Sequence, residues 1–388
     1  MFSNGMELLN DNFIIYSSEQ LPSYNEFYNN VMKQNKACLF GSKLTEQWKC
    51  RKEWISNNDD SNRINFDYLA KKYGNLIVPV YNCNRKHFNS NPKNEMLFNE
   101  YVRYWKKFIE NDNGESMEIL YLKDWHLVQD SVDNDFYSIP EYFESDYLNE
   151  YCRDKQITDF KFVYMGPTGS RTPLHIDVFG SFSWSSNIIG TKRWIMIPDY
   201  SIDRLKQLIG WDELPHDLKI LPNYPEILEK VQGFEVIQQA GEIIFVPSGY
   251  LHQVENLTNT ISINHNWFNA CNLERIFNNL LNALNDVQNE IKDLKVDMND
   301  DGEEWNELCD KILTIHFGMN RQYFLEIIRN SIDNRLFRSS NSNKFLQQQH
   351  DFECLKKILK KILLNENFSK KTNDNDRKNL ESLEKIVI

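Results

Sequence analysis

The middle of the chain is a succession of short apolar runs that turn residues separate. Between residues 160 and 267, glycine, proline, asparagine or threonine follows most of these runs. Short strand-like runs with frequent turn signals are typical of an all-β sandwich or barrel. The stretch 201–232, which contains several prolines, is predicted to be an insertion between strands. The runs read FKFVYMG, PLHIDV, SFSWSSNIIG, KRWIMIP, FEVIQQAGEIIFVP, HQVENL and TISINHNW.

The segments on either side of this region carry helical periodicity. Upstream, helices alternate with strands, whereas downstream the strand-like runs stop and only helical faces follow. The pattern predicts a mainly β core with α elements: N-terminal α/β elements over 1–150, a β core over 151–270 and a helical region over 271–388. The expected helices are 23–35, 66–74, 94–112, 272–294, 303–318, 321–337 and 351–364, and the expected upstream strands are 37–42, 76–81 and 116–127.

The C-terminal helices have apolar faces that need a partner. We expect these faces to pack within the chain, and a homodimer through the same helices is the alternative. The segment 351–364 is basic and amphipathic, as membrane-surface helices are. A partly buried helix is the interpretation that we favour for it.

Composition narrows the class of protein. The 388 residues carry a net charge of −12 with a pI near 5.3, which argues against a general nucleic-acid binder but not against a basic protein partner. The N-terminal segment lacks the pattern of a signal peptide, and no apolar run is long enough to span a membrane. Seven cysteines without a CxxC pair favour reduced thiols in the cytoplasm or nucleus, and they give no support to a structural zinc site.

Candidate chemistry appears first in TPLHIDVFGSFSW, residues 172–184. His175 and Asp177 are two apart in a strand-like run, so both side chains are expected on one face of the strand, with Ile176 and Val178 on the other. Buried polar groups without partners cost about 2–7 kcal/mol by transfer scales. A metal ion would satisfy both groups, whereas a hydrogen-bonded or surface pair is the alternative.

A second histidine makes the metal interpretation more specific. In AGEIIFVPSGYLHQVENL, Pro247 and Gly249 end one strand and His252 begins the next. An antiparallel barrel can bring His252 beside the first two groups, and two histidines with one carboxylate form the facial triad of non-haem Fe(II) oxygenases. His265 is the rival ligand, although a buried core histidine is its more common role. The other histidines have no companion carboxylate at ligand spacing and are expected to be structural or exposed: His87, His126, His216, His316 and His350.

Two long stretches resemble a known family. FVYMGPTGSRTPLHIDVFGSFSWSSNIIGTKRWIMIP and GEIIFVPSGYLHQVENLTNTISINHNWFNACNL look like a Jumonji-C (JmjC) domain, and the likeness extends over about residues 12–280. The segments SFSWSSNIIG and SINHNWFNACNL are similar to those of a lysyl hydroxylase branch of that family. The resemblance implies a double-stranded β-helix of the cupin or jelly-roll kind that uses Fe(II), 2-oxoglutarate and O₂. It also implies that His175, Asp177 and His252 are the iron ligands.

The same resemblance assigns residues to the co-substrate. Lys192 matches the lysine that binds the distal carboxylate of 2-oxoglutarate, a role that needs a fixed positive charge. An outward-facing strand residue is the alternative for Lys192, as is expected for its neighbour Arg193. Thr172 and Tyr121 match hydroxyl donors to that carboxylate, and Asn264 matches a small polar residue near it.

One corner of the expected site departs from the family. Ser185 stands where several members carry asparagine, and Asn187, two residues on and on the same strand face, is the candidate replacement. The aromatic residues nearby are expected to form the core rather than a substrate cage: Phe182, Trp184, Trp194 and Trp267.

The resemblance also implies a function. It points to a cytoplasmic protein hydroxylase that acts on a lysine side-chain carbon of the eukaryotic translation release factor, with no catalytic residue needed beyond the metal centre. An N-methyl-lysine demethylase is the first alternative, although no histone-reader module or basic tail is evident. A non-catalytic JmjC or cupin-like binding module is the second, and the intact metal motif with Lys192 argues against it.

Overall fold

The structure, a computed structural model, divides the chain into two compact units that are described separately. The first unit comprises residues 1–144, 160–177 and 182–266, and the second comprises 145–159, 178–181 and 267–388. Residues 145–159 therefore group with the C-terminal helices, and the three-part division expected above stays a prediction. The described residues are 6–56, 64–85, 91–111, 114, 117–132, 134–210, 214–221, 223–297, 303–337, 345–368 and 371–385.

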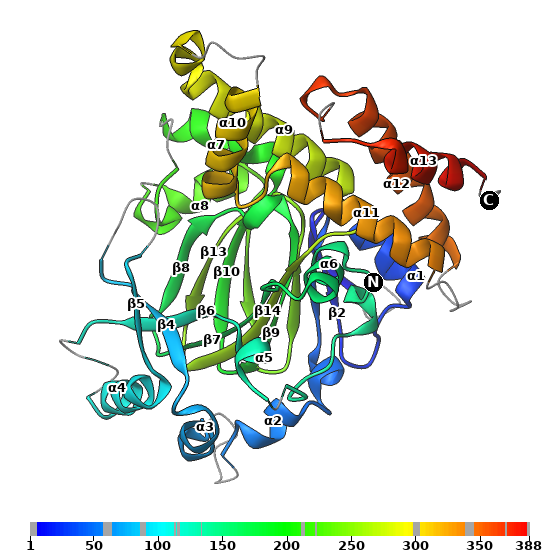
Figure 1. Cartoon of the computed structure of the whole chain (residues 1–388). Helices are drawn as coiled ribbons and strands as arrows, with labels where there is room; N and C mark the ends of the chain where they lie inside the picture. Colours follow the sequence, from blue (N-terminus) through cyan, green and yellow to red (C-terminus); the bar gives the residue numbers. More distant parts are fainter. Residues whose placement is uncertain are drawn as a thin grey trace. The chain divides into compact units, whose positions relative to one another are not determined.

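The first unit contains two sheets, which Figure 1 shows. Most neighbouring strands pair antiparallel, whereas β2 and β3 run parallel. The larger sheet has ten strands in the order β1 (Met6–Asn10), β2 (Phe13–Tyr16), β3 (Ala37–Phe40), β12 (Ile243–Val246), β9 (Phe182–Ile189), β14 (Thr260–Trp267), β7 (Lys161–Gly166), β6 (Leu120–Trp125), β4 (Ile77–Asn82) and β5 (Lys93–Leu97). The smaller sheet is antiparallel, in the order β11 (Phe234–Gln238), β10 (Lys192–Ile197), β13 (Leu251–Asn256) and β8 (Arg171–His175).

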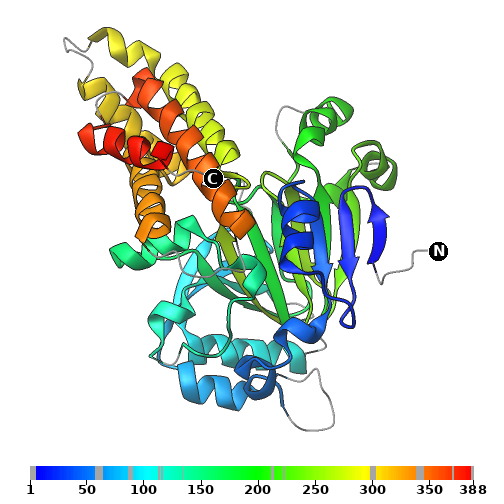
Figure 2. The same cartoon turned by 90° about the vertical axis from the view of Figure 1, so that its right-hand side faces the viewer.

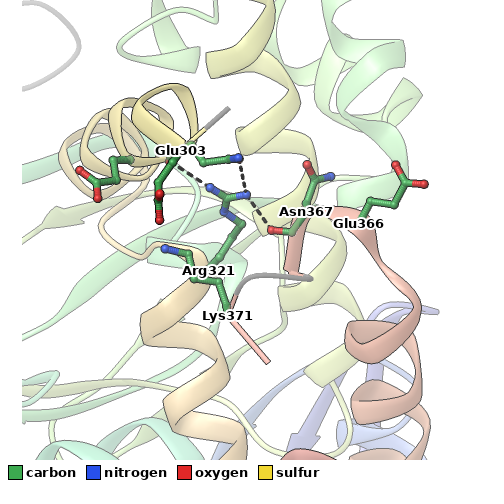
Figure 3. A pocket seen from close by; sticks show the side chains of 7 residues that line it. Glu303, Arg321, Glu366, Asn367 and Lys371 are labelled. Carbon is green, nitrogen blue, oxygen red and sulfur yellow. Dashed lines mark hydrogen bonds between the residues drawn. The ribbon is translucent and has the colours of Figure 1, made fainter. Parts of the chain in front are cut away.

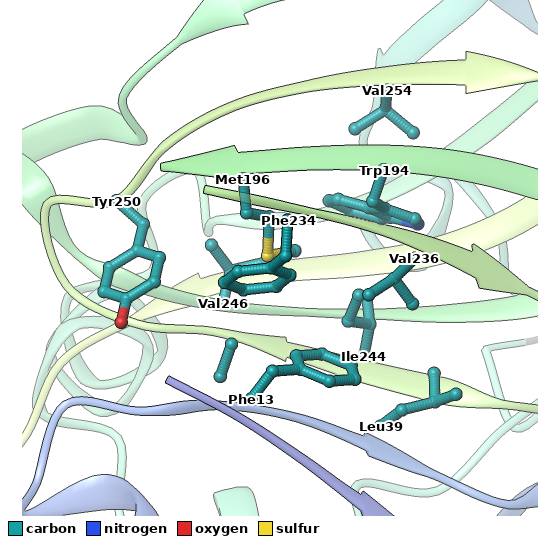
Figure 4. Packing of buried hydrophobic residues seen from close by; sticks show 11 residues of the cluster. Phe13, Leu39, Trp194, Met196, Phe234, Val236, Ile244, Val246, Tyr250 and Val254 are labelled. Carbon is teal, nitrogen blue, oxygen red and sulfur yellow. The ribbon is translucent and has the colours of Figure 1, made fainter. Parts of the chain in front are cut away.

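One face of each sheet contributes to a shared apolar core (Figure 4). We call these the inner faces. Because successive strand residues alternate between faces, every second residue of a central strand reaches this core. The cluster joins Trp194, Met196, Phe234, Val236 and Val254 of the smaller sheet to Phe13, Ala37, Leu39, Ile244 and Val246 of the larger one, with Tyr250 at its edge.

The insertion expected over 201–232 covers the outer face of the smaller sheet. It lies between β10 and β11 and forms short helices, whose apolar residues pack with Ile195, Ile197 and Leu251. The elements are η5 (Asp199–Ser201), α7 (Ile202–Ile209), η6 (Leu218–Ile220) and α8 (Tyr224–Lys230).

The N-terminal elements extend the larger sheet, because β1 to β6 are strands of it. The predicted strands 37–42, 76–81 and 116–127 correspond to β3, β4 and β6. The expected helix 94–112 starts too early, since residues 93–97 pair with β4 as β5. Figure 2 gives a second view of these elements, and the helices of the region are α1 (Tyr24–Phe27), η1 (Tyr28–Met32), η2 (Ser42–Thr45), α2 (Lys49–Glu53), α3 (Phe66–Tyr73), α4 (Phe98–Glu110), α5 (Leu127–Asp130) and η3 (Glu141–Phe143).

The second unit is helical. The face of α9 predicted from the sequence is buried through Leu273, Ile276, Phe277, Leu280 and Leu284, which confirms the expectation of packing within the chain for that helix. The elements are α6 (Tyr147–Lys155), η4 (Val178–Gly180), α9 (Leu273–Glu290), η7 (Lys292–Asp297), α10 (Glu303–Phe317), α11 (Arg321–Phe337), α12 (Phe345–Leu364), η9 (Glu366–Phe368) and α13 (Asp374–Lys385).

Two further sequence predictions bear on the whole chain. All seven cysteines are free thiols, as expected. Within the described ranges, none of the helices combines the length and apolar character that crossing a membrane requires.

Candidate metal centre

The two histidines of the predicted triad lie opposite each other on neighbouring strands. His252 on β13 is the register partner of His175 on β8, and the centroids of the two rings are 4.2 Å apart. Both histidines are on the inner face, because His252 is also the partner of Met196, a member of the shared core. Pairing of distant segments in an antiparallel sheet therefore brings the histidines together.

A β-bulge decides which other residues share this face. Between the pairs His252–His175 and Val254–Thr172, β13 advances by two residues and β8 by three. The extra residue on β8 restores Thr172 to the face of His175, although the two are three apart in sequence. The bulge thus places a hydroxyl beside the metal residues.

Asp177 completes the triad from outside the strand. The prediction that His175 and Asp177 share a strand is wrong, because β8 ends at His175. The carboxylate is instead fixed by side chains of the larger sheet. Ser183 donates a 2.7 Å hydrogen bond to Oδ2, and Asn266 also hydrogen-bonds to the carboxylate. Ile176, expected to point into the opposite face, is 42% exposed.

The three side chains form a compact donor set. Asp177 oxygens lie 4.0 Å from Nε2 of His175 and 3.9 Å from Nε2 of His252, and one ligand atom from each of the three lies within 4.8 Å of the others. It is the one group of three or more potential metal-binding side chains found among the described residues. Two imidazole nitrogens and one carboxylate oxygen are donors that suit Fe(II).

Hydrogen bonds behind the rings set their protonation. Nδ1 of His175 lies 2.8 Å from the carbonyl oxygen of Pro173, and Nδ1 of His252 lies 3.1 Å from that of Tyr250. A carbonyl only accepts, so each Nδ1 carries the proton and each Nε2 presents a lone pair to the triad.

Charge in the triad also favours a bound cation. Desolvation and the neighbouring His252 lower the pKa of His175 to about 4. Desolvation opposes ionisation of Asp177, but the two imidazoles and the Ser183 hydroxyl lower the pKa of its carboxyl overall. Neutral His175 and an ionised carboxylate at neutral pH are the states that coordinate a metal, so these residues fit Fe(II).

Lys192 is a buried cation on the same inner face as the two histidines. It lies on β10 on the inner face, two residues from Trp194, and only 1% of it is exposed. Its Nζ donates a 2.7 Å hydrogen bond to Oγ of Ser262, and no ion pair joins it to the described part of the chain. Burial lowers the pKa of this lysine to about 7. Its neighbour Arg193 lies instead near Glu235 and Glu255, at 3.9 and 3.7 Å.

Two of the other predicted co-substrate residues, Asn264 and Tyr121, lie near Lys192, and Thr172 shares its face. Asn264 donates a 3.1 Å hydrogen bond to Ser262, the acceptor of the lysine proton. Tyr121 on β6 is buried and lies near Asn256, the register partner of Lys192. Gly166 makes room for Tyr121, because a Cβ there would approach the tyrosine ring to 2.5 Å. Thr172 faces the same side through the bulge.

Asn187 has a different setting. It is fully buried on β9, and its amide donates a 2.6 Å hydrogen bond to the carbonyl of Gly190, in the turn to β10. That turn needs glycine, since Gly190 has φ +85°. Oδ1 of Asn187 and Oγ of Ser185 have no hydrogen-bond partner in the described part of the chain. A role for Asn187 toward the co-substrate stays a prediction.

His265 and the expected core aromatic residues are buried. His265 is buried, 2.7 Å from the hydroxyl of Tyr137 and stacked on Trp184 at 4.1 Å, so it belongs to a packed aromatic cluster and not to the triad. His126 packs against Phe162, and His87 lies outside the described residues. The expected core aromatics are all buried: Phe182, Trp184, Trp194 and Trp267.

Sequence reasoning missed several residues of the site. Ser262 alternates with Asn264 and Asn266 in TISINHNW, and this polar face of a strand was the available signal. The hydroxyl of Ser183 and the Tyr164–Asp124 pair, which hydrogen-bond at 2.7 and 2.6 Å, had no such signal.

The second unit also has a polar pocket, and the arginine in its wall has a structural role (Figure 3). Arg321 lies in its wall and donates to both carboxylate oxygens of Asp310, to Asn306 and to the carbonyl of Asn367. These bonds engage the whole guanidinium, so the arginine fixes α11 to its neighbours. The pocket is lined by Glu303, Asn306, Glu307, Arg321, Glu366, Asn367 and Lys371.

Comparison with known proteins bears directly on this arrangement. Residues 162–267 match the family model described as "JmjC domain, hydroxylase", and this range holds the triad and Lys192. The chain is 40% identical to a zebrafish (Danio rerio) protein named 2-oxoglutarate and iron-dependent oxygenase JMJD4, over 84% of this chain and 76% of the relative. The human protein of that name is 38% identical over 81% of this chain and 74% of its own. A protein of Arabidopsis thaliana named arginine-specific demethylase JMJ20 is 37% identical over 83% of this chain and 71% of its own.

Proposed function

The chain belongs to the JmjC-domain family of 2-oxoglutarate and iron-dependent oxygenases, and we propose that it hydroxylates a lysine side-chain carbon in a protein substrate. The observation that carries this proposal is Lys192. A buried ammonium without an anionic partner among the described residues, on the same inner face as His175 and His252, suits a dianion that also reaches the metal. We also propose that the two sheets form the double-stranded β-helix of the family.

The chain's residues have distinct roles in this proposal. His175, Asp177 and His252 would hold Fe(II), and Lys192 with Tyr121 and Thr172 would bind the distal carboxylate of 2-oxoglutarate. When bound, iron and 2-oxoglutarate supply the oxidation, in which O₂ converts 2-oxoglutarate to succinate and CO₂ and hydroxylates a C–H bond.

Other side chains support these groups. Ser183 and Asn266 hold the carboxylate of Asp177 in position, while Asn264 and Ser262 support the ammonium of Lys192. Asn187 completes the set that we assign near the co-substrate. Trp194 stacks on His252 with centroids 5.8 Å apart and packs apolar surface behind that ring. No general base is required from the protein.

The substrate that we propose is the eukaryotic translation release factor, which would place the protein in the cytoplasm, with the nucleus as alternative. The support is the likeness of SFSWSSNIIG and SINHNWFNACNL to the lysyl hydroxylase branch and a net charge of −12, which suits a basic peptide. The same charge disfavours nucleic acid as a partner.

Demethylation is the second candidate, and the name of the Arabidopsis relative favours it. Hydroxylation adds one oxygen to an unmodified lysine side chain, whereas demethylation removes a methyl group from an N-methylated lysine. Mass spectrometry of the modified peptide separates the two. Absence of succinate formation would instead favour a non-catalytic binding module.

The test uses the full chain with Fe(II), 2-oxoglutarate and recombinant release factor. We expect succinate to form together with one added oxygen on a lysine of the release factor. The matched control is His252→Ala, which should give neither product. Succinate without modified release factor would contradict the proposed substrate, and no succinate with any substrate would contradict the proposed activity.

A further inference from the structure

A strained residue lies on the inner face at the end of β6. Asp124 has φ +60°, a left-handed conformation that residues other than glycine seldom adopt. It lies within a second bulge, because β6 advances by three residues between Leu122 and Trp125 while β7 advances by two, from Met165 to Val163. Such conformations are costly and concentrate at functional sites.

The strain directs the carboxylate toward the co-substrate residues. Tyr164 donates a 2.6 Å hydrogen bond to Oδ1 of Asp124, and the phenol of Tyr81 lies near this side chain. Tyr164 is the register partner of Ser262, the acceptor of Lys192, and its ring lies 5.9 Å from that of Tyr121. The carboxylate is therefore on the wall that holds the proposed 2-oxoglutarate contacts.

No cation of the described residues pairs with this carboxylate. Lys123 is adjacent in sequence and buried, yet its Nζ lies over the ring of Tyr81, 4.4 Å from the centroid, and makes no ion pair with Asp124. The hydrogen bond from Tyr164 does not neutralise the carboxylate, so its charge is available to a cation that binds. Within the described residues, Lys192 thus has no anionic partner in an ion pair and Asp124 has no cationic one.

We propose that Asp124, held by Tyr164, binds the charged ammonium of the substrate lysine and is the residue that selects a cationic side chain. The proposal rests on the function proposed above. A carboxylate forms charge-assisted hydrogen bonds with an ammonium, and the ring of Tyr164 adds the aromatic surface that cations favour. Anchoring the end of the side chain would position its carbons for oxidation at the neighbouring metal centre.

The test compares two peptides that differ in one group. Both span the target lysine of the release factor, and the second carries norleucine, which keeps the carbon chain and lacks the ammonium. We expect the wild-type chain to prefer the lysine peptide about 10–100-fold in kcat/KM, the range of a charge-assisted hydrogen bond. Asp124→Asn keeps an acceptor for Tyr164 and removes the charge, so the preference should fall to within about threefold of unity.

A second variant separates recognition from backbone strain. Asp124→Gly adopts φ +60° without strain, which offsets part of the lost hydrogen bond from Tyr164, so it should remain folded and also lose the preference for lysine. Asp67→Asn is the charge-matched control, because Asp67 is 92% exposed and pairs with Lys106 on the surface of the first unit. It should keep the preference unchanged.

The outcomes distinguish the two proposals. If the wild type hydroxylates the lysine peptide and both Asp124 variants keep its preference over norleucine, the assignment of Asp124 is wrong and the proposed function stands. If the wild type turns over 2-oxoglutarate but never hydroxylates the lysine peptide, both proposals are overturned.

Discussion

Lys192 and Ser262 connect the two sheets of the first unit through one hydrogen bond, from Nζ to Oγ at 2.7 Å. Lys192 lies on β10 of the smaller sheet and Ser262 on β14 of the larger one. A hydroxyl can accept the hydrogen bond but cannot compensate the charge, so a buried ammonium in this setting is costly until an anion arrives. The pair marks where the distal carboxylate of 2-oxoglutarate is expected.

Replacement of this lysine should weaken co-substrate binding selectively. Lys192→Ala is expected to raise the KM for 2-oxoglutarate about 10–100-fold, because charge-assisted hydrogen bonds contribute about 1.5–3 kcal/mol. Metal affinity should barely change, since Lys192 is not a ligand. The measurement is a 2-oxoglutarate titration of succinate formation at saturating Fe(II), with Lys192→Arg expected to rescue only in part. A Lys192→Ala protein that titrates like the wild type would place the co-substrate elsewhere.

The metal residues should behave as one unit. Each of His175→Ala, Asp177→Ala and His252→Ala is expected to abolish succinate formation and weaken Fe(II) binding, because each removes one of three ligands. The fold should persist, since the core between the sheets is apolar and forms without metal. Calorimetric titration with Fe(II) under anaerobic conditions and circular dichroism measure the two effects separately.

His265 provides the matched control for the metal residues. His265→Gln should keep metal affinity and turnover while lowering the free energy of unfolding by about 1–3 kcal/mol, because the ring is buried between Tyr137 and Trp184. Loss of metal binding in this variant with a stable fold would make His265 a ligand and the assigned triad wrong.

The sequence predicted the elements better than the contacts between them. His175, Asp177 and His252 could be selected because a histidine two residues from a carboxylate and a second histidine after a Pro-Gly turn are local features. The shared face of Thr172 and His175 could not be predicted, since it depends on a bulge that exists only where β8 meets β13. Asp177 also joins the triad for a reason other than strand alternation, because β8 ends before it.

The sequence pattern could not predict features that depend on pairing between strands distant in sequence. Asp124 reads as an ordinary polar residue in LYLKDW, and its role emerges only when β6 pairs with β7 and Tyr164 reaches it. The prediction that a helix starts at residue 94 was wrong for a similar reason, because residues 93–97 form a strand once β4 lies beside them. Tertiary pairing can override local periodicity in this way.

The homodimer through the C-terminal helices remains untested, and we expect a monomer. Apolar residues of α9 and α11 are buried within the chain, including Leu280, Leu284, Phe324 and Ile328, so little apolar surface is left on these helices for a partner copy. Sedimentation velocity of the full chain at low and high micromolar concentration checks this. A concentration-dependent shift to twice the mass would show that a second copy binds.

The affinity for 2-oxoglutarate should depend on pH through Lys192. Burial lowers the pKa of the free protein's lysine to about 7, so its ammonium loses the proton as pH rises through that value. A bound dianion favours the charged form and raises this pKa, so binding above about pH 7 requires proton uptake. Affinity is therefore expected to be constant below about pH 7 and to fall up to about tenfold per pH unit above it.

Calorimetric titration with 2-oxoglutarate from about pH 6 to about pH 9, at fixed metal saturation, measures this dependence, and two buffers of different ionisation enthalpy count the protons. Lys192→Arg is the control: its guanidinium stays charged over this range, so its weaker binding should lose the slope that Lys192 contributes.

The pKa of Lys192 also affects the stability of the protein without 2-oxoglutarate. Between about pH 7 and pH 10.4 the unfolded chain binds the lysine proton more tightly than the folded chain, so this group makes stability rise with pH. A wild-type affinity as flat as that of Lys192→Arg would mean that the lysine stays protonated in the free protein because a partner other than 2-oxoglutarate balances its charge.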